Sequence, residues 1–408
     1  MDGIQKRQIR KFELYGFLKN LKFFEPFLIV YLFSFEISLF QIGLLYSIRE
    51  VIIYSFEIPS GVLADRFGKK NELILCFIFY IFSFTLFFIG GPYYIFVIGF
   101  VLYGFGEAFR SGTHKALIMD YLDYETLSVS KSEIYGKTRS RSLQGSMVSS
   151  FLAIIFVFVL PEIKYLFLIA IIPYLVDILL IISYPKYMNK RLDTTFSFKK
   201  FLKDNVDSVV YSLKDKEMRG LLYSSSTYNA WFKSVKDYVQ PILVMMTVSF
   251  VVISGITEDE TVLIYLAVLY MVIFFISSLG SKYAYRFKPF MTEESITTYI
   301  WIPSAILMLT LGLFIENIVV VIIVFILFYL IFNIRKPLMI ELIGDVCEKD
   351  KRSSVLSIES QLTSLFIIVM APLFGYLSDT YSIAMMFILF SSAILVFEVG
   401  KLLTRKNV

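Results

Sequence analysis

The chain has 408 residues, of which 57% are hydrophobic and only 18% are charged, and its mean hydropathy is +0.72. In soluble domains about a quarter of the residues are charged, so this composition excludes an ordinary soluble protein and indicates a membrane protein. A single histidine and two cysteines exclude multi-histidine metal or haem ligation and a disulfide framework, so we expect no metal and no cofactor.

Apolar segments follow one another along the whole chain, separated by short polar stretches. Each is long enough, at about 1.5 Å per residue, to cross a hydrocarbon layer of roughly 30 Å. We therefore predict an all-α membrane protein with twelve transmembrane helices. They are expected near residues 12–33, 41–63, 72–90, 93–118, 142–160, 165–184, 218–248, 261–284, 296–315, 318–340, 354–376 and 380–402.

The cations between these segments fall almost entirely in the loops of one side, and the loops of the other side hold only Lys164. Because cytoplasmic loops are rich in lysine and arginine, we expect a multi-pass protein of the cell (inner) membrane with both termini in the cytoplasm. The N-terminal stretch MDGIQKRQIRKFELYGF lacks a small-residue cleavage site, which favours a cytoplasmic tail over a cleaved signal. The formal net charge of +5 is explained by this distribution, so we expect no nucleic-acid partner.

Short motifs recur in the same order in the two halves of the chain. For example, HKALIMD at 114–120 corresponds to RKPLMIE at 335–341. We therefore predict two six-helix bundles, at residues 1–184 and 218–408, built as parallel repeats. Residues 185–217 form the polar linker, and the spacing of its apolar residues predicts an amphipathic helix on the cytoplasmic surface.

The stretch GVLADRFGKK, residues 61–70, places two glycines, an acid and three cations between the second and third segments. The second glycine is expected to allow a tight turn, and the cations to hold that turn at the inner face. The stretch resembles the signature G-x-L-A-D-R-x-G-R/K-K of the major facilitator superfamily, in the loop where that family carries it. The resemblance implies the major facilitator fold and a cytoplasmic gate formed by Gly61, Asp65, Arg66, Gly68, Lys69 and Lys70.

Charged residues interrupt the first, fourth, seventh and tenth segments, which line the central cavity in the family that the chain resembles. A charge at the bilayer centre costs about 2.5–3.5 kcal/mol, so it should line a polar cavity or be paired. In these segments eight cations oppose three acids, which favours a cavity for a small anion such as a carboxylate or a phosphate ester. The expected substrate-binding residues are Lys19, Lys22, Arg110, His114, Lys115, Lys233, Lys236, Gln240, Arg335 and Lys336.

Proton coupling requires a group within the membrane that can titrate. The candidate carboxylates are Glu107, Glu25 and Asp237. Glu107 is the first choice because Arg110 and His114, at three- and four-residue spacings, are expected on the same helix face. His114 is itself a candidate.

Two further expectations concern residues within the segments. Asp177, in the sixth segment, is expected in an interhelical ion pair. Pro26, Pro241 and Pro337 are expected to break helical hydrogen bonds near the charges of the first, seventh and tenth segments.

These features predict a secondary active transporter of a small organic anion that works by alternating access and is coupled to protons. One alternative is a multidrug exporter of lipophilic compounds, and another is a non-transporting membrane receptor or lipid-handling protein on the same fold. The sequence contains no Walker-type phosphate-binding loop and no nucleophile-base-acid set, so we expect no enzyme. The expected partners are a small-molecule substrate and the lipid bilayer, with function as a monomer.

Overall fold

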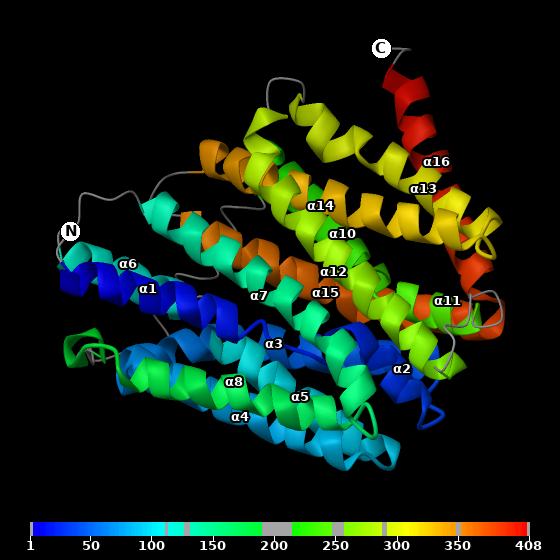
Figure 1. Cartoon of the computed structure of the whole chain (residues 1–408). Helices are drawn as coiled ribbons and strands as arrows, with labels where there is room; N and C mark the ends of the chain where they lie inside the picture. The colour runs from blue at the N-terminus through cyan, green and yellow to red at the C-terminus, as the bar shows by residue number, and fades with distance from the viewer. Residues whose placement is uncertain are drawn as a thin grey trace. The chain divides into compact units, whose positions relative to one another are not determined.

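The computed structural model describes residues 3–110, 113–125, 131–189, 214–246, 257–287, 292–347 and 352–405. Nearly all of these residues lie in helices, and no strand occurs among them (Figure 1). The predicted all-α class agrees with this architecture. The amphipathic helix predicted within the linker lies mostly outside the described residues.

The elements follow in chain order, with short 3-10 or π turns (η) between the α-helices. They are α1 (Gly3–Leu18), η1 (Glu25–Phe27), α2 (Leu28–Phe33), α3 (Leu39–Phe67), α4 (Lys69–Ile89), α5 (Tyr93–Arg110), α6 (Thr113–Tyr124), α7 (Lys131–Val159), α8 (Tyr165–Ile182), η2 (Lys186–Asn189), α10 (Lys216–Val235), α11 (Val239–Met245), α12 (Glu258–Tyr283), η4 (Ala284–Arg286), η6 (Ser295–Tyr299), α13 (Trp301–Leu313), α14 (Ile318–Val346), α15 (Arg352–Thr380) and α16 (Ile383–Arg405).

Eight helical stretches in the described part of the chain are long and apolar enough to cross a membrane. The stretch Ile383–Glu398 of α16 is a shorter apolar helix. This pattern supports a multi-pass membrane protein, while the number of twelve spans stays a prediction.

Two of the predicted segments are divided between helices instead of forming one. The first comprises α1, η1 and α2, and the seventh comprises α10 and α11. The fourth comprises α5 and α6, and residues 111–112 between them lie outside the described part of the chain. Pro26 lies in η1 and Pro241 near the start of α11, where the missing N–H of proline costs no helical hydrogen bond. Pro337 lies inside α14, which continues through this residue although proline cannot donate a helical hydrogen bond there.

The residues group into two compact units, each described here by itself. Unit 1 comprises Met1–Glu36, Ile48–Phe196 and Asp259–Phe275, and unit 2 comprises Ile37–Ser47, Ser197–Glu258 and Ile276–Val408. The start of α3 therefore groups with the second unit, and the first part of α12 with the first unit. The predicted halves, 1–184 and 218–408, did not include this exchange.

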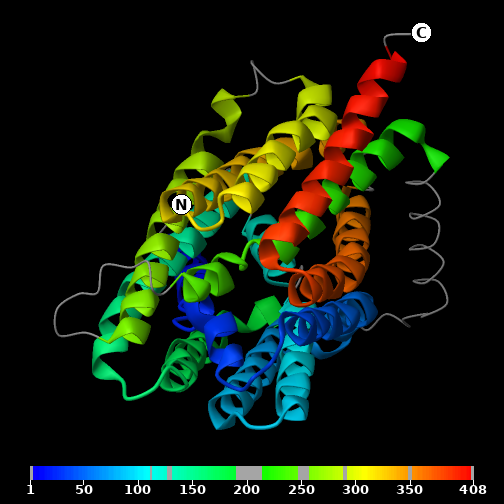
Figure 2. The same cartoon turned by 90° about the vertical axis from the view of Figure 1, so that its right-hand side faces the viewer.

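In unit 1, α1 packs against α7, and α4 packs along α5 and α8 (Figure 2). Glycine lets α1 and α7 approach closely. A Cβ atom on Gly145 would lie only 2.3 Å from the carbonyl oxygen of Phe17. These contacts fix the helices that carry the charged side chains of the first half.

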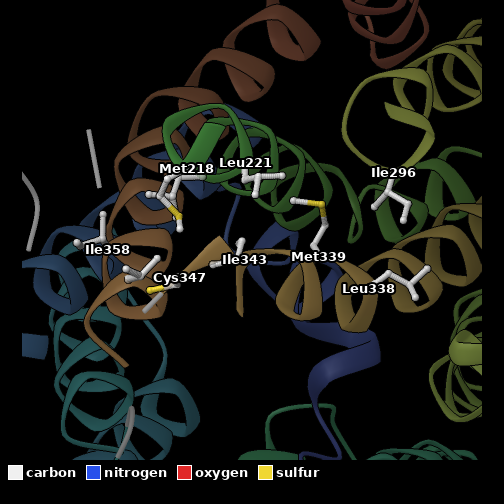
Figure 3. Packing of buried hydrophobic residues seen from close by; sticks show 10 residues of the cluster. Met218, Leu221, Ile296, Leu338, Met339, Ile343, Cys347 and Ile358 are labelled. Atoms are coloured by element: carbon white, nitrogen blue, oxygen red, sulfur yellow. The ribbon is translucent and has the colours of Figure 1, made fainter. Parts of the chain in front are cut away.

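In unit 2, α10 packs against α15, and α13 packs against α16. Side chains of α10, η6, α14 and α15 form a buried core that includes Met218, Leu221, Ile296 and Met339 (Figure 3). The pairs α1–α7 and α4–α8 of unit 1 correspond in chain order to α10–α15 and α13–α16 of unit 2. Helix pairs in the same chain order thus recur in the two units.

Candidate functional site

The described residues of unit 1 bring several charged side chains together near the end of α5. Arg110 Nη2 lies 2.5 Å from Glu107 Oε2. Tyr80 of α4 donates a hydrogen bond to Glu107 Oε1 (2.7 Å) and accepts one from Arg110 Nε (3.2 Å). Lys22 Nζ lies 3.8 Å from Glu107 Oε1 and donates to the Tyr103 hydroxyl. We call these five residues the Glu107 cluster.

The Glu107 cluster carries more positive than negative charge, because Lys22 and Arg110 share one carboxylate. Lys22 also lies 5.0 Å from the ring centroid of Tyr103, an arrangement that stabilises a cation. The side chains of Lys22, Glu107 and Arg110 are 18%, 21% and 27% exposed in that order, so the cluster is accessible from the surface of unit 1. An anion that contacts it would meet a net positive charge.

Lys19 lies next to this cluster, in the interruption after α1. Its Nζ atom is 5.8 Å from the ring centroid of Tyr15, and its backbone carbonyl accepts a hydrogen bond of 2.9 Å from Tyr174. No ion pair of Lys19 is found within the described ranges. Glu25 lies in η1, close enough to Lys22 to interact with its charge.

Arg110 is the last described residue of α5 and His114 lies in α6, and residues 111–112 between the two elements lie outside the described part of the structure, so the predicted common face stays a prediction. The imidazole of His114 stacks on Tyr15, with ring centroids 3.7 Å apart. Lys115 lies on α6, and its side chain lies outside the described part of the structure.

In unit 2 a corresponding group of charges lies where α10 gives way to α11. Lys236 Nζ lies 2.8 Å from Asp237 Oδ1, and Lys236 is 24% exposed. Gln240 is buried at 1% exposure. Lys233 is half-buried and has no ion pair among the described residues. In both units, therefore, two lysines three residues apart lie at or next to the interruption of a predicted span. They are Lys19 and Lys22 in unit 1 and Lys233 and Lys236 in unit 2.

Arg335 of α14 is directed into the protein interior, and its exposure is 2%. Its guanidinium donates to the backbone oxygens of Ile296 (2.9 Å) and Ser224 (3.1 Å) and lies 4.4 Å from the ring centroid of Tyr228. These contacts occupy N–H groups of the Arg335 guanidinium that were expected to bind a substrate anion. Arg335 thus holds α10, η6 and α14 together in this structure, while Lys336 lies over the Phe332 ring at 5.6 Å.

The loop predicted as a gate is shorter than the sequence suggested. Gly61, Asp65 and Arg66 lie within α3, and the side chains of Asp65 and Arg66 lie outside the described part of the structure. Only Gly68 separates α3 from α4, and it has a φ of 93°. A Cβ atom here would lie 2.2 Å from Asn189 Oδ1, so both the backbone and the available space require glycine.

The two lysines after this glycine attach the start of α4 to other helices of unit 1. Lys69 Nζ lies 2.6 Å from Asp120 Oδ2 of α6. Lys70 Nζ donates to the backbone oxygens of Ile182 (3.1 Å) and Tyr184 (2.6 Å), which belong to the carboxyl end of α8 and the residues after it. A cation stabilises this end of a helix because its last carbonyl groups have no helical partner.

Sequence reasoning missed the tyrosines of the Glu107 cluster. Tyr103 precedes Glu107 by four residues on α5, a spacing that places both on one helix face and was visible in the sequence. Tyr80 comes from α4, and no signal in the sequence connects it with Glu107. The analysis of charges also missed the contact of Glu359 on α15 with Ser225 (2.8 Å) and Asn229 (2.5 Å) of α10.

The sequence pattern of the Major Facilitator Superfamily matches residues 20–358, so the chain belongs to this family of membrane transporters. Two curated relatives match shorter regions. The uncharacterised MFS-type transporter YxaM of Bacillus subtilis (strain 168) is 28% identical over 156 residues, which is 36% of this chain and 37% of that protein. The uncharacterised MFS-type transporter MJ1317 of Methanocaldococcus jannaschii is 28% identical over 112 residues, covering 26% of this chain and 27% of that protein.

Solved transporter structures resemble nearly the whole chain. The nucleoside transporter NupG has a TM-score of 0.76 at 13% identity, with 96% of this chain and 98% of that chain covered. The peptide transporter POT in complex with sulfate has a TM-score of 0.74 at 10% identity, with 98% and 94% covered. A D-xylose-proton symporter has a TM-score of 0.66 at 14% identity, with 96% of each chain covered. At these identities the likeness establishes the fold alone.

Proposed function

We propose that the chain is a secondary active transporter of a small organic anion, working by alternating access and coupled to protons. The observation that carries this proposal is the Glu107 cluster, in which Lys22 and Arg110 share one carboxylate within apolar helices. Membership of a transporter family supports transport in general, and the charge of the cluster supports the choice of an anion.

The chemistry of anion binding follows from the donors of this cluster. Arg110 presents a planar guanidinium that suits a carboxylate or phosphate, and Lys22 presents a compact ammonium. A bound anion would take over part of the role of Glu107, whose carboxylate is held by both cations and by the Tyr80 hydroxyl. Because these contacts favour the charged form of Glu107, we propose that it acts as an internal counter-ion. Lys233 and Lys236 are the proposed contributors from unit 2.

Transport assays with reconstituted protein test this proposal. Proteoliposomes would be screened for uptake of labelled carboxylates and phosphate esters, using wild type, Arg110→Ala and Lys22→Gln. The surface variant Arg141→Ala serves as the control, because Arg141 is 53% exposed and its guanidinium lies 3.6 Å from Glu13. We expect at least tenfold slower anion uptake in the two cluster variants and normal uptake in the control. Uptake that is undiminished in both cluster variants would contradict the anion site.

One observation favours the multidrug exporter as a second candidate. Unit 2 contains a cavity of about 690 Å³ between α10, α13, α15 and α16. Its walls include Trp301 and Phe390, and its charged residues are three acids, Glu217, Glu293 and Glu398, and one cation, Lys216. Apolar walls with carboxylates suit a lipophilic cation. Competition between hydrophobic cations for uptake, lost in Glu398→Gln and kept in Arg110→Ala, would favour this candidate over the anion transporter.

A further inference from the structure

The inner half of α8 contains a buried acid that the proposed anion site does not use. Asp177 is 0% exposed, and neither carboxylate oxygen has a hydrogen-bond partner among the described residues. The expected interhelical ion pair of Asp177 is therefore not found within the part of the chain that the structure describes. A carboxylate buried in this way is strongly unfavourable in its charged form. The groups around Asp177 therefore determine whether it is charged or protonated.

The helices packed against α8 surround Asp177 with titratable groups. From the α1 side come Tyr15 and Lys19, and Tyr184 follows α8 itself. α4 also packs along α8, and its Tyr80 ring contacts Tyr174. His114 stacks on Tyr15, and Glu107 and Arg110 bond to Tyr80. Lys11 and Lys70 are occupied at the end of α8, where their ammonium groups bond to the backbone oxygens of Ser183 and Tyr184.

Lys19 is the cation that packing places near Asp177. The hydroxyl of Tyr174 donates to the backbone oxygen of Lys19 at 2.9 Å. Tyr174 precedes Asp177 by three residues on α8, so this bond holds Lys19 on the same side of the helix. Lys19 in turn lies beside the Glu107 cluster, where its charge interacts with those of Glu107 and Arg110.

Three more buried polar atoms near Asp177 have no hydrogen-bond partner within the described ranges. They are the hydroxyls of Tyr15 and Tyr184 and the Nε2 atom of His114. The rings of His114 and Tyr184 both contact Phe12, and His114 stacks on Tyr15. Unsatisfied buried polar groups are rare in proteins, so several in one region indicate a site where protons or water enter.

We propose that Asp177 is the carboxyl that carries the coupled proton, and that Lys19 links this proton to the anion. When Asp177 holds a proton on one carboxylate oxygen, it is neutral, and Lys19 is free to bind the anion. When that proton leaves to water, the Asp177 carboxylate takes Lys19 as its counter-ion and the anion loses a partner. No bond other than the O–H bond changes, and proton and anion move in the same direction. This mechanism rests on the proposed anion transport.

Infrared spectroscopy of the full chain in liposomes tests the proton site without a transported substrate, because the probe is the proton itself. We expect a protonated-carboxyl band at neutral pH that disappears at alkaline pH and is missing in Asp177→Asn. The control Asp237→Asn removes a carboxylate that is paired with Lys236 and should keep the band. Identical spectra for wild type and Asp177→Asn would overturn the proposal. If Asp177→Asn does not fold, Asp177→Glu must change the frequency of the band, and an unchanged frequency would overturn it equally.

The link to Lys19 has its own readout. In Lys19→Gln the carboxylate of Asp177 has no counter-ion, so the band should persist to a more alkaline pH than in wild type. Lys19→Arg keeps the charge and should restore the wild-type pH profile. An unchanged profile in Lys19→Gln would remove Lys19 from the mechanism. A negative anion screen combined with the expected infrared result would contradict anion transport but leave Asp177 as the proton site.

Discussion

Glu107 is the residue on which the charge balance of the proposed anion site depends. Its carboxylate contacts Lys22 and Arg110 at once, and the Tyr80 hydroxyl donates a further hydrogen bond. Removing this shared partner takes away the carboxylate that both cations contact, and a largely buried group that loses its partner typically costs about 1–3 kcal/mol. An anion from solution can then occupy the vacated position, since the donors stay in place.

The unfolding temperature of Glu107→Gln, measured with and without sulfate as the probe, tests this role of Glu107. We expect a lower unfolding temperature than wild type without sulfate, and a larger rise with sulfate because a ligand that binds the folded form stabilises it. The control is Glu294→Gln, which changes an exposed acid outside the Glu107 cluster. An equal response to sulfate in all three proteins would show that the cluster does not bind anions.

At the scale of elements, the start of α3 and the end of α15 form a tight contact within unit 2. Asp379 accepts hydrogen bonds from the backbone N–H groups of Leu39 (3.1 Å) and Phe40 (2.7 Å), which are the first residues of α3. Next to this cap, a Cβ atom on Gly375 would lie 2.3 Å from the Leu39 oxygen, and one on Gly43 would lie 2.4 Å from the Ala371 oxygen. The contact therefore depends on glycine on both helices and on one carboxylate.

Substitutions in this contact should destabilise the protein in a graded way. Gly375→Val forces the backbones apart, and overpacking of this kind typically costs about 1–3 kcal/mol. Asp379→Asn removes the negative charge at the amino end of α3, and the loss of such a charge typically costs about 0.3–1 kcal/mol of stability. Gly220→Ala is the matched control, because a Cβ atom at Gly220 of α10 meets nothing within 4 Å. Unfolding temperatures in detergent provide the measurement, and a Gly375→Val protein as stable as the control would contradict the close packing.

Hydropathy predicted the helical elements better than their interruptions. The first segment was predicted as one span over residues 12–33, yet the structure divides it between α1, η1 and α2. Prolines were an incomplete guide, since Pro26 and Pro241 lie beside interruptions while Pro337 lies inside α14. Whether a proline interrupts a helix depends on which neighbouring groups satisfy the freed carbonyl, and the local sequence does not contain that information.

At the scale of the whole molecule, composition was sufficient for the all-helical class, and the motif at 61–70 for the family. The candidate site was only partly predictable, because its geometry depends on partners from other helices. Lys22 and Arg110 were recognised as intramembrane cations, but only the fold shows that they share Glu107. Arg335 looked equivalent in the sequence and is buried against backbone oxygens instead. A charge pattern therefore identifies candidates, and packing shows which of them are engaged with backbone groups.

The orientation in the membrane is a property of the whole molecule that the distribution of cations predicts. Lys164 lies between α7 and α8, and Lys186 lies in η2 after α8, so the two residues flank one predicted span. Because inner loops are enriched in cations and Lys164 is the exception, we expect residue 164 outside the cell and residue 186 in the cytoplasm. Both positions are accessible for substitution, since Lys164 is 31% exposed and Lys186 is exposed.

Single-cysteine variants measure this directly with a maleimide that cannot cross membranes. In intact cells Lys164→Cys should be labelled, and Lys186→Cys should be labelled only after the membrane is permeabilised. The two native cysteines, Cys76 and Cys347, are buried at 0% and 5% exposure and should add little background, which the wild-type chain controls. Labelling of Lys186→Cys in intact cells, with Lys164→Cys silent until lysis, would reverse the orientation. It would also place the lysines of α4 and the gate loop on the outer face.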